Sequence, residues 1–286
     1  MITAHQGFDH LYTKVADIRA ACAALGDMGF STTSLDEQKA YSMGLVSVVF
    51  QDAWLAFSGP IGPDVPGDLD GVANDAARLN ALPAPIAEQL TGLGPQPILI
   101  FAASDLKAFV SECASAGLNP SKPEVYPRPT MTETGPAEIR FEMTGTEPLI
   151  ADAEAMLEIV GLKHLTPDIF FRPALLAHEN GAKSIDAVTL PVQQSDELSE
   201  RLMQLIPSSQ AASATPPGWR LGDVTVGLDM ARSGVEIAVQ DINRMRVLLS
   251  ARGVNFTQQG GALVVQDHRL AGLSIQFKEL NETPAL

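Results

Sequence analysis

The stretch FDHLYTKVADIRAACAALGDMGF, residues 8–30, decides the fold. It begins as an extended apolar segment from Phe8 to Val15 and continues, after Asp17, as a helix that ends at Gly29. Apolar residues recur from Ile18 onward at the spacing of one helix face, which predicts that this face packs on a sheet. An aspartate at the start and a glycine after the end are residue types that favour helix termini. The stretch therefore predicts a strand followed by a helix that covers it.

The same pattern returns along the chain at the same spacing. Asp105 to Gly117 and Asp241 to Gly253 each span twelve residues, as Asp17 to Gly29 does, and each follows an apolar segment. A weaker copy runs from Ser184 to Pro207 and lacks the glycine. About three further strand-like segments follow each helix. Repetition at one spacing is the signature of a modular architecture. The sequence therefore predicts an α+β fold in which four βαβββ modules form two curved mixed sheets with the helices outside.

Taken pairwise, the modules predict two domains. The first module pair is expected over residues 1–150 and the second over 184–286, with 151–183 as the connecting segment. Within the first pair, residues 59–97 are rich in Pro and Gly but contain helical patterns near 70–80 and 86–90. This composition predicts an elaborated connection between modules one and two.

Composition and charge exclude several classes of function. The chain of 286 residues has a formal net charge of −15 and no cluster of Lys and Arg, so a nucleic-acid partner is not expected. No run reaches the roughly 18 apolar residues that span a bilayer. The first residues also lack the basic start and apolar stretch of a secretory signal. We therefore expect a cytoplasmic protein with a small-molecule ligand and no membrane or nucleic-acid partner, and a homodimer is left open.

Two stretches of the chain carry recognisable motifs. The first contains Phe8-Asp9-His10-Leu11, Val15-Ala16-Asp17-Ile18 and the segment Leu25 to Phe30, and the second runs from His164 through Pro173 to Ala182. These motifs resemble the vicinal oxygen chelate superfamily, which holds glyoxalase I, bleomycin-resistance proteins and extradiol dioxygenases. The resemblance implies a glyoxalase-like fold over most of the chain. In this superfamily each pair of modules forms a cup in which ligands bind.

Strand alternation identifies candidate residues in the first cup. On the first strand His10 and Tyr12 share one face, and the apolar residues share the other. If the helix covers the apolar face, His10 points into the cup, where the superfamily places its first metal ligand. The other positions lack donors, because Ala56 stands where the family would place a glutamate and Ile98 stands at the position that matches His10.

A charged strand face supplies further candidates. Glu138, Arg140 and Glu142 alternate with Ile139, Phe141 and Met143, and the charged set faces the cup if the apolar set packs under the helix. The second module pair presents only Ala187, Gly234 and Ala238 where donors would be needed. The first cup is therefore expected to be the ligand site.

Two functions remain open. In the first, a divalent metal (Zn, Fe, Mn or Ni) bound by His10 and Glu142 serves a lyase, isomerase or dioxygenase acting on vicinal oxygens, with Glu142 as the catalytic carboxylate that moves a proton. Catalytic sites of this kind normally have three protein ligands. In the second, the metal site is degraded and the cup holds a small, partly apolar or anionic molecule. The residues expected to bind that molecule are His10, Tyr12, Trp54, Ile98, Ile100 and Arg140.

The missing donors at Ala56 and Ile98 favour the metal-free binding protein. His164 and His178 lie fourteen residues apart, and their spacing matches no standard metal motif. They are expected to have structural roles near the turn at Asn180-Gly181.

Overall fold

The computed structural model describes residues 2, 6–33, 35–38, 43–60, 94–95, 98–147, 149, 157–191, 195–206, 211–212, 218–229 and 233–280. The helical pieces expected near 70–80 and 86–90 lie outside these residues. The described helices include none that is long and apolar enough to cross a membrane.

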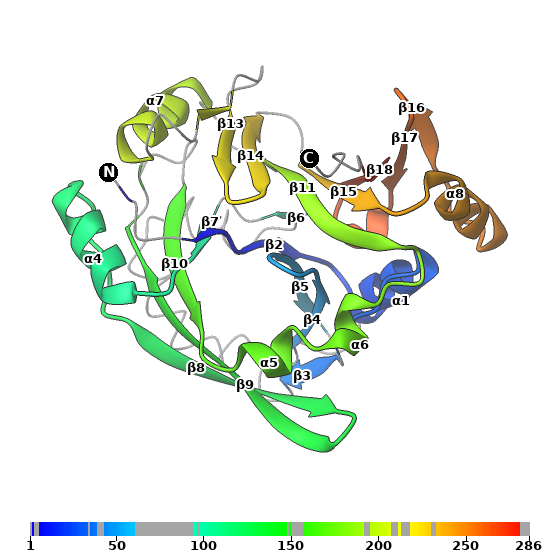
Figure 1. The fold of residues 1–286 in the computed structure, drawn as a ribbon, viewed down its shortest axis with the longest axis horizontal. Helices are drawn as coiled ribbons and strands as arrows, with labels where there is room; N and C mark the ends of the chain where they lie inside the picture. Colours follow the sequence, from blue (N-terminus) through cyan, green and yellow to red (C-terminus); the bar gives the residue numbers. More distant parts are fainter. Residues whose placement is uncertain are drawn as a thin grey trace, which may run out of the picture.

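The α+β fold of four βαβββ modules is confirmed, with α4, α7 and α8 at the periphery (Figure 1). The first half contains β1 (Gly7–Phe8), β2 (His10–Lys14), α1 (Ile18–Asp27), β3 (Asp36–Gln38), β4 (Met43–Val49), β5 (Trp54–Pro60), β6 (Gly94–Pro95), β7 (Ile98–Ala102), α4 (Leu106–Ser115), β8 (Glu124–Thr132), β9 (Gly135–Gly145) and β10 (Glu158–His164). Two short helices follow, α5 (Pro167–Phe170) and α6 (Pro173–Leu176).

The second half contains the third and fourth modules. Its elements are β11 (Ala182–Pro191), α7 (Ser195–Leu205), β12 (Ala211–Ala212), β13 (Gly218–Leu221), β14 (Val224–Asp229), β15 (Gly234–Val239), α8 (Ile242–Ala251), β16 (Thr257–Gln259), β17 (Ala262–Gln266), the 3-10 turn η4 (His268–Leu270) and β18 (Ser274–Glu279).

The repeated helices begin and end at the residues that the sequence predicts. Asp17, Asp105 and Asp241 each accept hydrogen bonds from the backbone N–H groups two and three residues later. The glycine after each of these helices has a positive φ, 80° at Gly29, 78° at Gly117 and 67° at Gly253. Glycine favours this left-handed exit because it has no Cβ.

The two halves differ in how their modules join. Modules three and four form one eight-stranded sheet in the order β12-β13-β14-β11-β15-β18-β17-β16. Modules one and two form two five-stranded sheets, β3-β4-β5-β2-β6 and β1-β7-β10-β9-β8, so the described strands form three sheets where two were expected. The first strand passes between these sheets at Asp9, whose N–H donates to the carbonyl of Ile100 at 2.8 Å and whose carbonyl accepts the N–H of Trp54 at 3.1 Å. Asp9 is therefore the residue at which the chain leaves one sheet of the first cup and enters the other.

The second module extends further than the sequence suggested. The sequence predicts that residues 158–164 lie in the connecting segment 151–183. In the structure they form β10, which pairs with β7 and β9. The connection between the halves thus begins only after His164. It continues through α5, which contacts β9, and α6, which contacts β4 (Figure 1).

Candidate functional site

The first strand has the expected orientation. Leu11 and Val15 belong to the core beneath the helices, together with Leu55 from β5. Tyr12, Trp54, Ile98 and Ile100 belong instead to a second cluster on the concave side, which we call the cup cluster. His10 stacks on Trp54 with ring centroids 3.7 Å apart, so it lies on the same side.

The expected orientation of β9 is wrong. Ile139, Phe141 and Met143 belong to the cup cluster, so the alternating charged set lies on the outer face. The side chain of Arg140 is half-exposed, and its Nε lies 3.7 Å from Glu138 Oε1. Glu142 lies opposite Lys163 in the register of β9 and β10. Alternation divides a strand into two sets of residues, but it does not say which set faces the cup. Here the apolar set fills the cup, where Ile139 and Phe141 are buried against Trp54 and Phe170.

Arg140 and Glu142 therefore do not join His10. Glu142 follows Phe141 in β9, and Phe141 stacks near Trp54 with ring centroids 6.2 Å apart. Since neighbouring side chains point to opposite faces of a strand, Glu142 faces away from the histidine with which it was expected to bind a metal.

The structure instead brings Asp9, His10, Trp54 and His164 together in what we call the Asp9 network. One carboxylate oxygen of Asp9 lies 2.6 Å from His10 Nδ1 and accepts the indole N–H of Trp54 at 2.8 Å. The other oxygen lies 3.0 Å from His164 Nε2. A single buried carboxylate thus holds two imidazoles and an indole that come from three strands.

The charges of the network follow from its geometry. Burial alone would raise the pKa of Asp9, but the hydrogen bonds from His10 and His164 outweigh burial and hold this pKa well below its ordinary value. Burial lowers the pKa of His10, although the hydrogen bond to Asp9 opposes this effect. Because an ionised carboxylate only accepts hydrogen bonds, His10 Nδ1 and His164 Nε2 both carry a proton. In the neutral ring, the remaining nitrogen of each histidine is an acceptor.

Asp9 is the residue that sequence reasoning missed. It lies within the quoted motif Phe8-Asp9-His10-Leu11, next to a predicted site histidine, and this proximity was the available signal. The sequence relates His164 only to His178, fourteen residues later. Nothing local indicates that His164 returns to Asp9, from which it is separated by 155 residues.

The connecting helices fill the cup. Phe170 of α5 and Leu175 of α6 are buried in the cup cluster. The ring of Phe170 lies 4.9 Å from that of Trp54 and 5.8 Å from that of Phe141, measured between centroids. The predicted ligand-binding residues His10, Trp54 and Ile100 are consequently buried.

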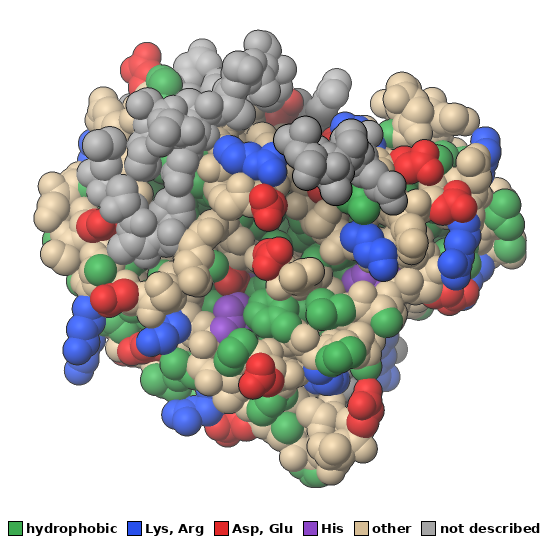
Figure 2. All heavy atoms as spheres, viewed as in Figure 1, with side chains coloured by type: hydrophobic (Ala, Val, Ile, Leu, Met, Phe, Trp, Pro, Cys, Tyr) green, Lys and Arg blue, Asp and Glu red, His purple; other side chains and the backbone are tan. Residues whose placement is uncertain are grey.

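A separate cavity of about 800 Å³ lies where the two halves meet. Asp9 and His164 reach it from the first half, and the turn at Gly222 borders it from the second. Its apolar wall includes Phe50 and Phe171. Figure 2 shows histidine atoms beside a patch of hydrophobic side chains near the centre of one face. Asp9 and His164 therefore border this cavity, while the ring of His164 also contacts Phe170 in the filled cup.

The residues of the cup do not fit a divalent metal. Both oxygens of Asp9 already accept hydrogen bonds, and Glu142 faces away. Ala56 and Ile98 offer no donor atoms. Within the described parts of the chain, no three His, Cys, Asp or Glu side chains form a group that could hold a metal ion. A catalytic zinc or iron site normally needs three such ligands.

His178 has a structural role. Its Nδ1 accepts the N–H of Ser31 at 3.1 Å, and its Nε2 donates to the carbonyl of Val49 at 3.1 Å. The next turn is held by Asn180, whose amide donates to the carbonyl of Met28 at 2.9 Å. These contacts attach the end of the connecting segment to module one, and they involve no residue of the Asp9 network.

Comparisons with known proteins report on the fold. No protein-family model matches the chain, and no curated protein matches it. Among solved structures, a hypothetical protein from Staphylococcus aureus superposes with a TM-score of 0.59 at 11% identity, covering 96% of this chain and 99% of the other.

Two further structures carry functional names. A mutant of 4-hydroxymandelate synthase from Streptomyces coelicolor gives a TM-score of 0.58 at 13% identity and covers 99% of this chain and 95% of its own. A fusion of a xylose isomerase-like TIM barrel with 4-hydroxyphenylpyruvate dioxygenase gives a TM-score of 0.52 at 12% identity. The superposition covers 100% of this chain and 51% of the fusion protein. At such low identity these likenesses show the fold alone.

Proposed function

We propose that this chain is a metal-free binding protein for a small molecule that is partly apolar and carries an anionic group. The binding site is the cavity between the halves. The observation that carries the proposal is the Asp9 network, which fixes His164 rigidly at the wall of a cavity of about 800 Å³. This volume lies within the range that small-molecule sites have, roughly 300–1,000 Å³.

The walls of the cavity support the ligand class. Leu162, Phe50 and Phe171 offer apolar surface, and Lys163 and Lys183 offer cationic groups. Three acidic residues also border the cavity: Asp52 and Asp223 are exposed, and the carboxylate of Asp9 is already bound by His10, Trp54 and His164. A carboxylate held by the two lysines can place its apolar part against the aromatic walls.

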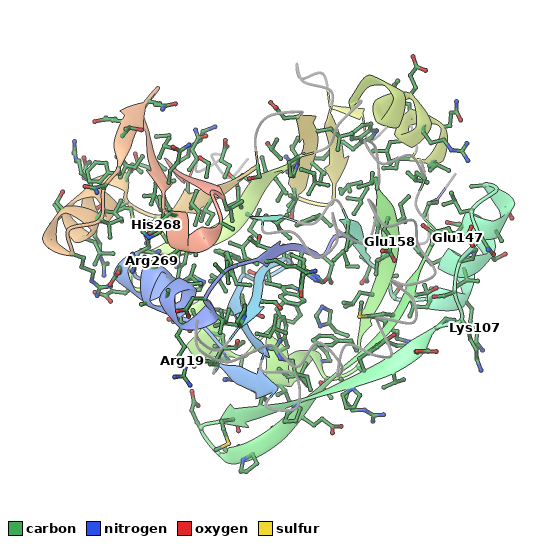
Figure 3. All side chains as sticks on the ribbon, turned by 180° about the vertical axis from the view of Figure 1, so that it is seen from behind. Arg19, Lys107, Glu147, Glu158, His268 and Arg269 are labelled. Carbon is green, nitrogen blue, oxygen red and sulfur yellow. The ribbon has the colours of Figure 1, made fainter. Side chains whose placement is uncertain are left out.

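The proposal is tested by calorimetric titration with small aromatic and aliphatic carboxylates, each paired with its uncharged amide. We expect binding of at least one carboxylate and weaker binding of its amide. Replacing Lys163 and Lys183 by Ala should weaken carboxylate binding about tenfold or more, because a charge-assisted hydrogen bond contributes about 1.5–3 kcal/mol. Lys107→Ala is the matched control, because Lys107 points away from the molecule on α4 (Figure 3). Equal effects of both changes would reject the cavity as the site.

The alternative is a metal-dependent lyase, isomerase or dioxygenase, and one protein of similar fold is named a dioxygenase. It is distinguished by elemental analysis of the purified protein. One equivalent of Zn, Fe, Mn or Ni that is lost in His10→Ala would favour the alternative. If the metal-free proposal holds, no such equivalent is present, and His10→Ala lowers the free energy of unfolding, because the buried carboxylate of Asp9 loses one hydrogen-bond partner.

A further inference from the structure

The hairpin formed by β8 and β9 has an exposed outer face. Residues that lie opposite each other in paired strands point to the same side of a sheet, so the residues of β8 that pair with the outward charged set of β9 also face outward. Eight residues share this side, as four pairs in the register of the strands: Val125–Glu142, Pro127–Arg140, Pro129–Glu138 and Met131–Pro136. Seven of the eight are exposed, and Glu142 is partly buried. We call these eight residues the hairpin face.

Helix α4 covers only the other end of these strands. It packs over Gly161 of β10, which pairs with Thr144 near the end of β9. In Figure 1 the hairpin runs from α4 to the opposite edge of the molecule, beyond the helix. Val125 and Met131 are consequently 45% and 55% exposed. With three prolines they form an apolar row beside a row of charges, and exposed apolar patches bordered by polar residues mark interaction sites.

The edge of β8 does not offer a continuous backbone for another strand. β8 is the last strand of its sheet, and Pro127 and Pro129 lie on either side of its middle residue. Proline has no N–H, so it occurs on edge strands with its nitrogen turned away from the sheet, where it prevents pairing with another chain. A protein that binds here therefore packs on the hairpin face and does not extend the sheet.

The hairpin face is complementary to itself. Consider a two-fold axis that lies between two such faces, perpendicular to the strands and level with Arg128 at the middle of β8. This axis places each strand antiparallel over its own copy. Pro127 then faces Pro129 of the second copy, and Val125 faces Met131 of the second copy. The apolar row therefore covers itself.

The same axis also matches the charges. It is level with Ile139 on β9, which lies opposite Arg128, so Glu138 of one copy faces Arg140 of the other and Arg140 faces Glu138. Within one copy these two side chains form an exposed ion pair, with Arg140 Nε 3.7 Å from Glu138 Oε1, and such a pair contributes little. Across the axis, four alternating charges come together. Glu142 gains no such contact, because it faces Pro136 of the second copy.

We propose that two copies of this chain associate through their hairpin faces, packed face to face about this two-fold axis. Eight residues a side are fewer than the roughly 20–30 of a stable interface, so the dimer is weak and forms as the protein concentration rises. Each copy has a formal net charge of −15, which opposes association at long range. The contacts between Glu138 and Arg140 fix the register of the two copies. No residue of the hairpin face lines the cavity between the halves, so this proposal does not depend on the proposed function.

The proposal is tested by sedimentation equilibrium of the full chain, at protein concentrations from about 1 µM to about 500 µM. We expect a monomer at the low end and a reversible dimer at the high end. Glu138→Arg and Arg140→Glu should each weaken association about tenfold or more, because like charges then meet on both sides of the axis.

An equimolar mixture of Glu138→Arg and Arg140→Glu is the decisive sample. One copy of each variant again brings opposite charges together at both contacts across the axis. The mixed pair also has the same total charge as two unmodified copies. We therefore expect the mixture to associate at least as tightly as the unmodified chain, although neither variant does so alone. This result also shows that both variants are folded.

Glu200→Arg is the matched control. It changes the net charge by the same amount as Glu138→Arg, but at an exposed position of α7, on the other side of the molecule from the hairpin (Figure 1). Association of this control should be no weaker than that of the unmodified chain. A chain that stays monomeric over the whole concentration range overturns the proposal and leaves the hairpin face to a different protein. Single variants that dimerise like the control, or a mixture that does not associate, also overturn it.

Discussion

At the scale of single residues, the chemistry of this chain centres on one carboxylate. Asp9 lies where the first strand passes from one sheet to the other, and it is the shared acceptor of His10, Trp54 and His164. A buried charge is stable only when its hydrogen-bonding capacity is satisfied. The network therefore supports the fold and orients His164 at the same time.

Asp9→Asn tests this dual role. The amide keeps one acceptor oxygen, but its NH2 group faces N–H donors and the negative charge is lost. We expect the free energy of unfolding to fall by about 3 kcal/mol at pH 7, as measured by urea denaturation. The control Asp52→Asn, in an exposed turn, should change it by less than about 0.5 kcal/mol. If the free energy of unfolding falls no more in Asp9→Asn than in Asp52→Asn, the network contributes no stability.

The buried histidines make stability depend on pH. Burial lowers the pKa of both His10 and His178, so the unfolded chain binds protons more readily than the folded one. Their contribution is fully present above the ordinary histidine pKa of about 6.5 and is lost as the pH falls below it. Unfolding free energy measured between pH 7.5 and 5 should decrease by up to about 1.4 kcal/mol per pH unit for each histidine. His178→Ala should be less stable at pH 7.5 and less sensitive to acid, and a stability that rises on acidification would contradict the assignment.

At the scale of secondary-structure elements, the distance between α4 and β10 is set by a glycine. A Cβ added to Gly161 would lie 2.7 Å from the ring of Phe109 and 3.1 Å from Leu106. These two side chains, with Cys113, form the buried face of α4. Gly161 therefore allows the helix to pack closely on the strand that presents His164.

Gly161→Ala should displace α4 and lower the free energy of unfolding by about 1–3 kcal/mol, because extra volume in a packed core forces its neighbours to move. Gly26→Ala is the opposite case, since nothing lies within 4 Å of its added Cβ and it lies inside α1. That change should stabilise the chain by about 0.5–1 kcal/mol. Thermal unfolding of both variants provides the measurement, and a neutral Gly161→Ala would show that the packing of α4 is looser than described.

At the scale of the whole molecule, the halves are joined by more than the connecting segment. Arg269 of η4 forms an ion pair with Asp27 at the end of α1, with Nη1 and Oδ2 3.0 Å apart, and Figure 3 shows Arg269 beside that helix. Arg252 of the second half donates to the carbonyl of Gly26 at 2.6 Å. The ring centroids of Phe30 and Phe277 lie 5.9 Å apart, and one hydrophobic core includes residues of both halves.

A shared core predicts that the halves unfold together. Each half has one tryptophan, Trp54 and Trp219. In the two single-tryptophan variants, Trp219→Phe and Trp54→Phe, the urea midpoint from fluorescence should coincide with that from far-ultraviolet circular dichroism. Two separated transitions would show instead that 1–150 and 184–286 behave as independent domains.

Sequence by itself determined the repeated module. The features that the sequence determines depend on contacts within about one helical turn or one strand. They are the helix starts at Asp17, Asp105 and Asp241, the helix ends at the following glycines, and the buried face of the first strand. Such local rules can be read from residue type and spacing. They were sufficient for the α+β class, for the four modules and for the placement of His10 in the cup.

Tertiary structure alone decided the composition of the site. Three features needed it: which face of β9 is buried, the return of His164 to Asp9, and the filling of the cup by Phe170. Each is a contact between segments that are remote in sequence, and strand alternation allows both orientations of β9 until the neighbouring elements are in place. Arg140 and Glu142 therefore lie outside the cup, and His10, Trp54 and His164 share the carboxylate of Asp9 instead, because packing of the apolar residues determines which polar side chains come into contact.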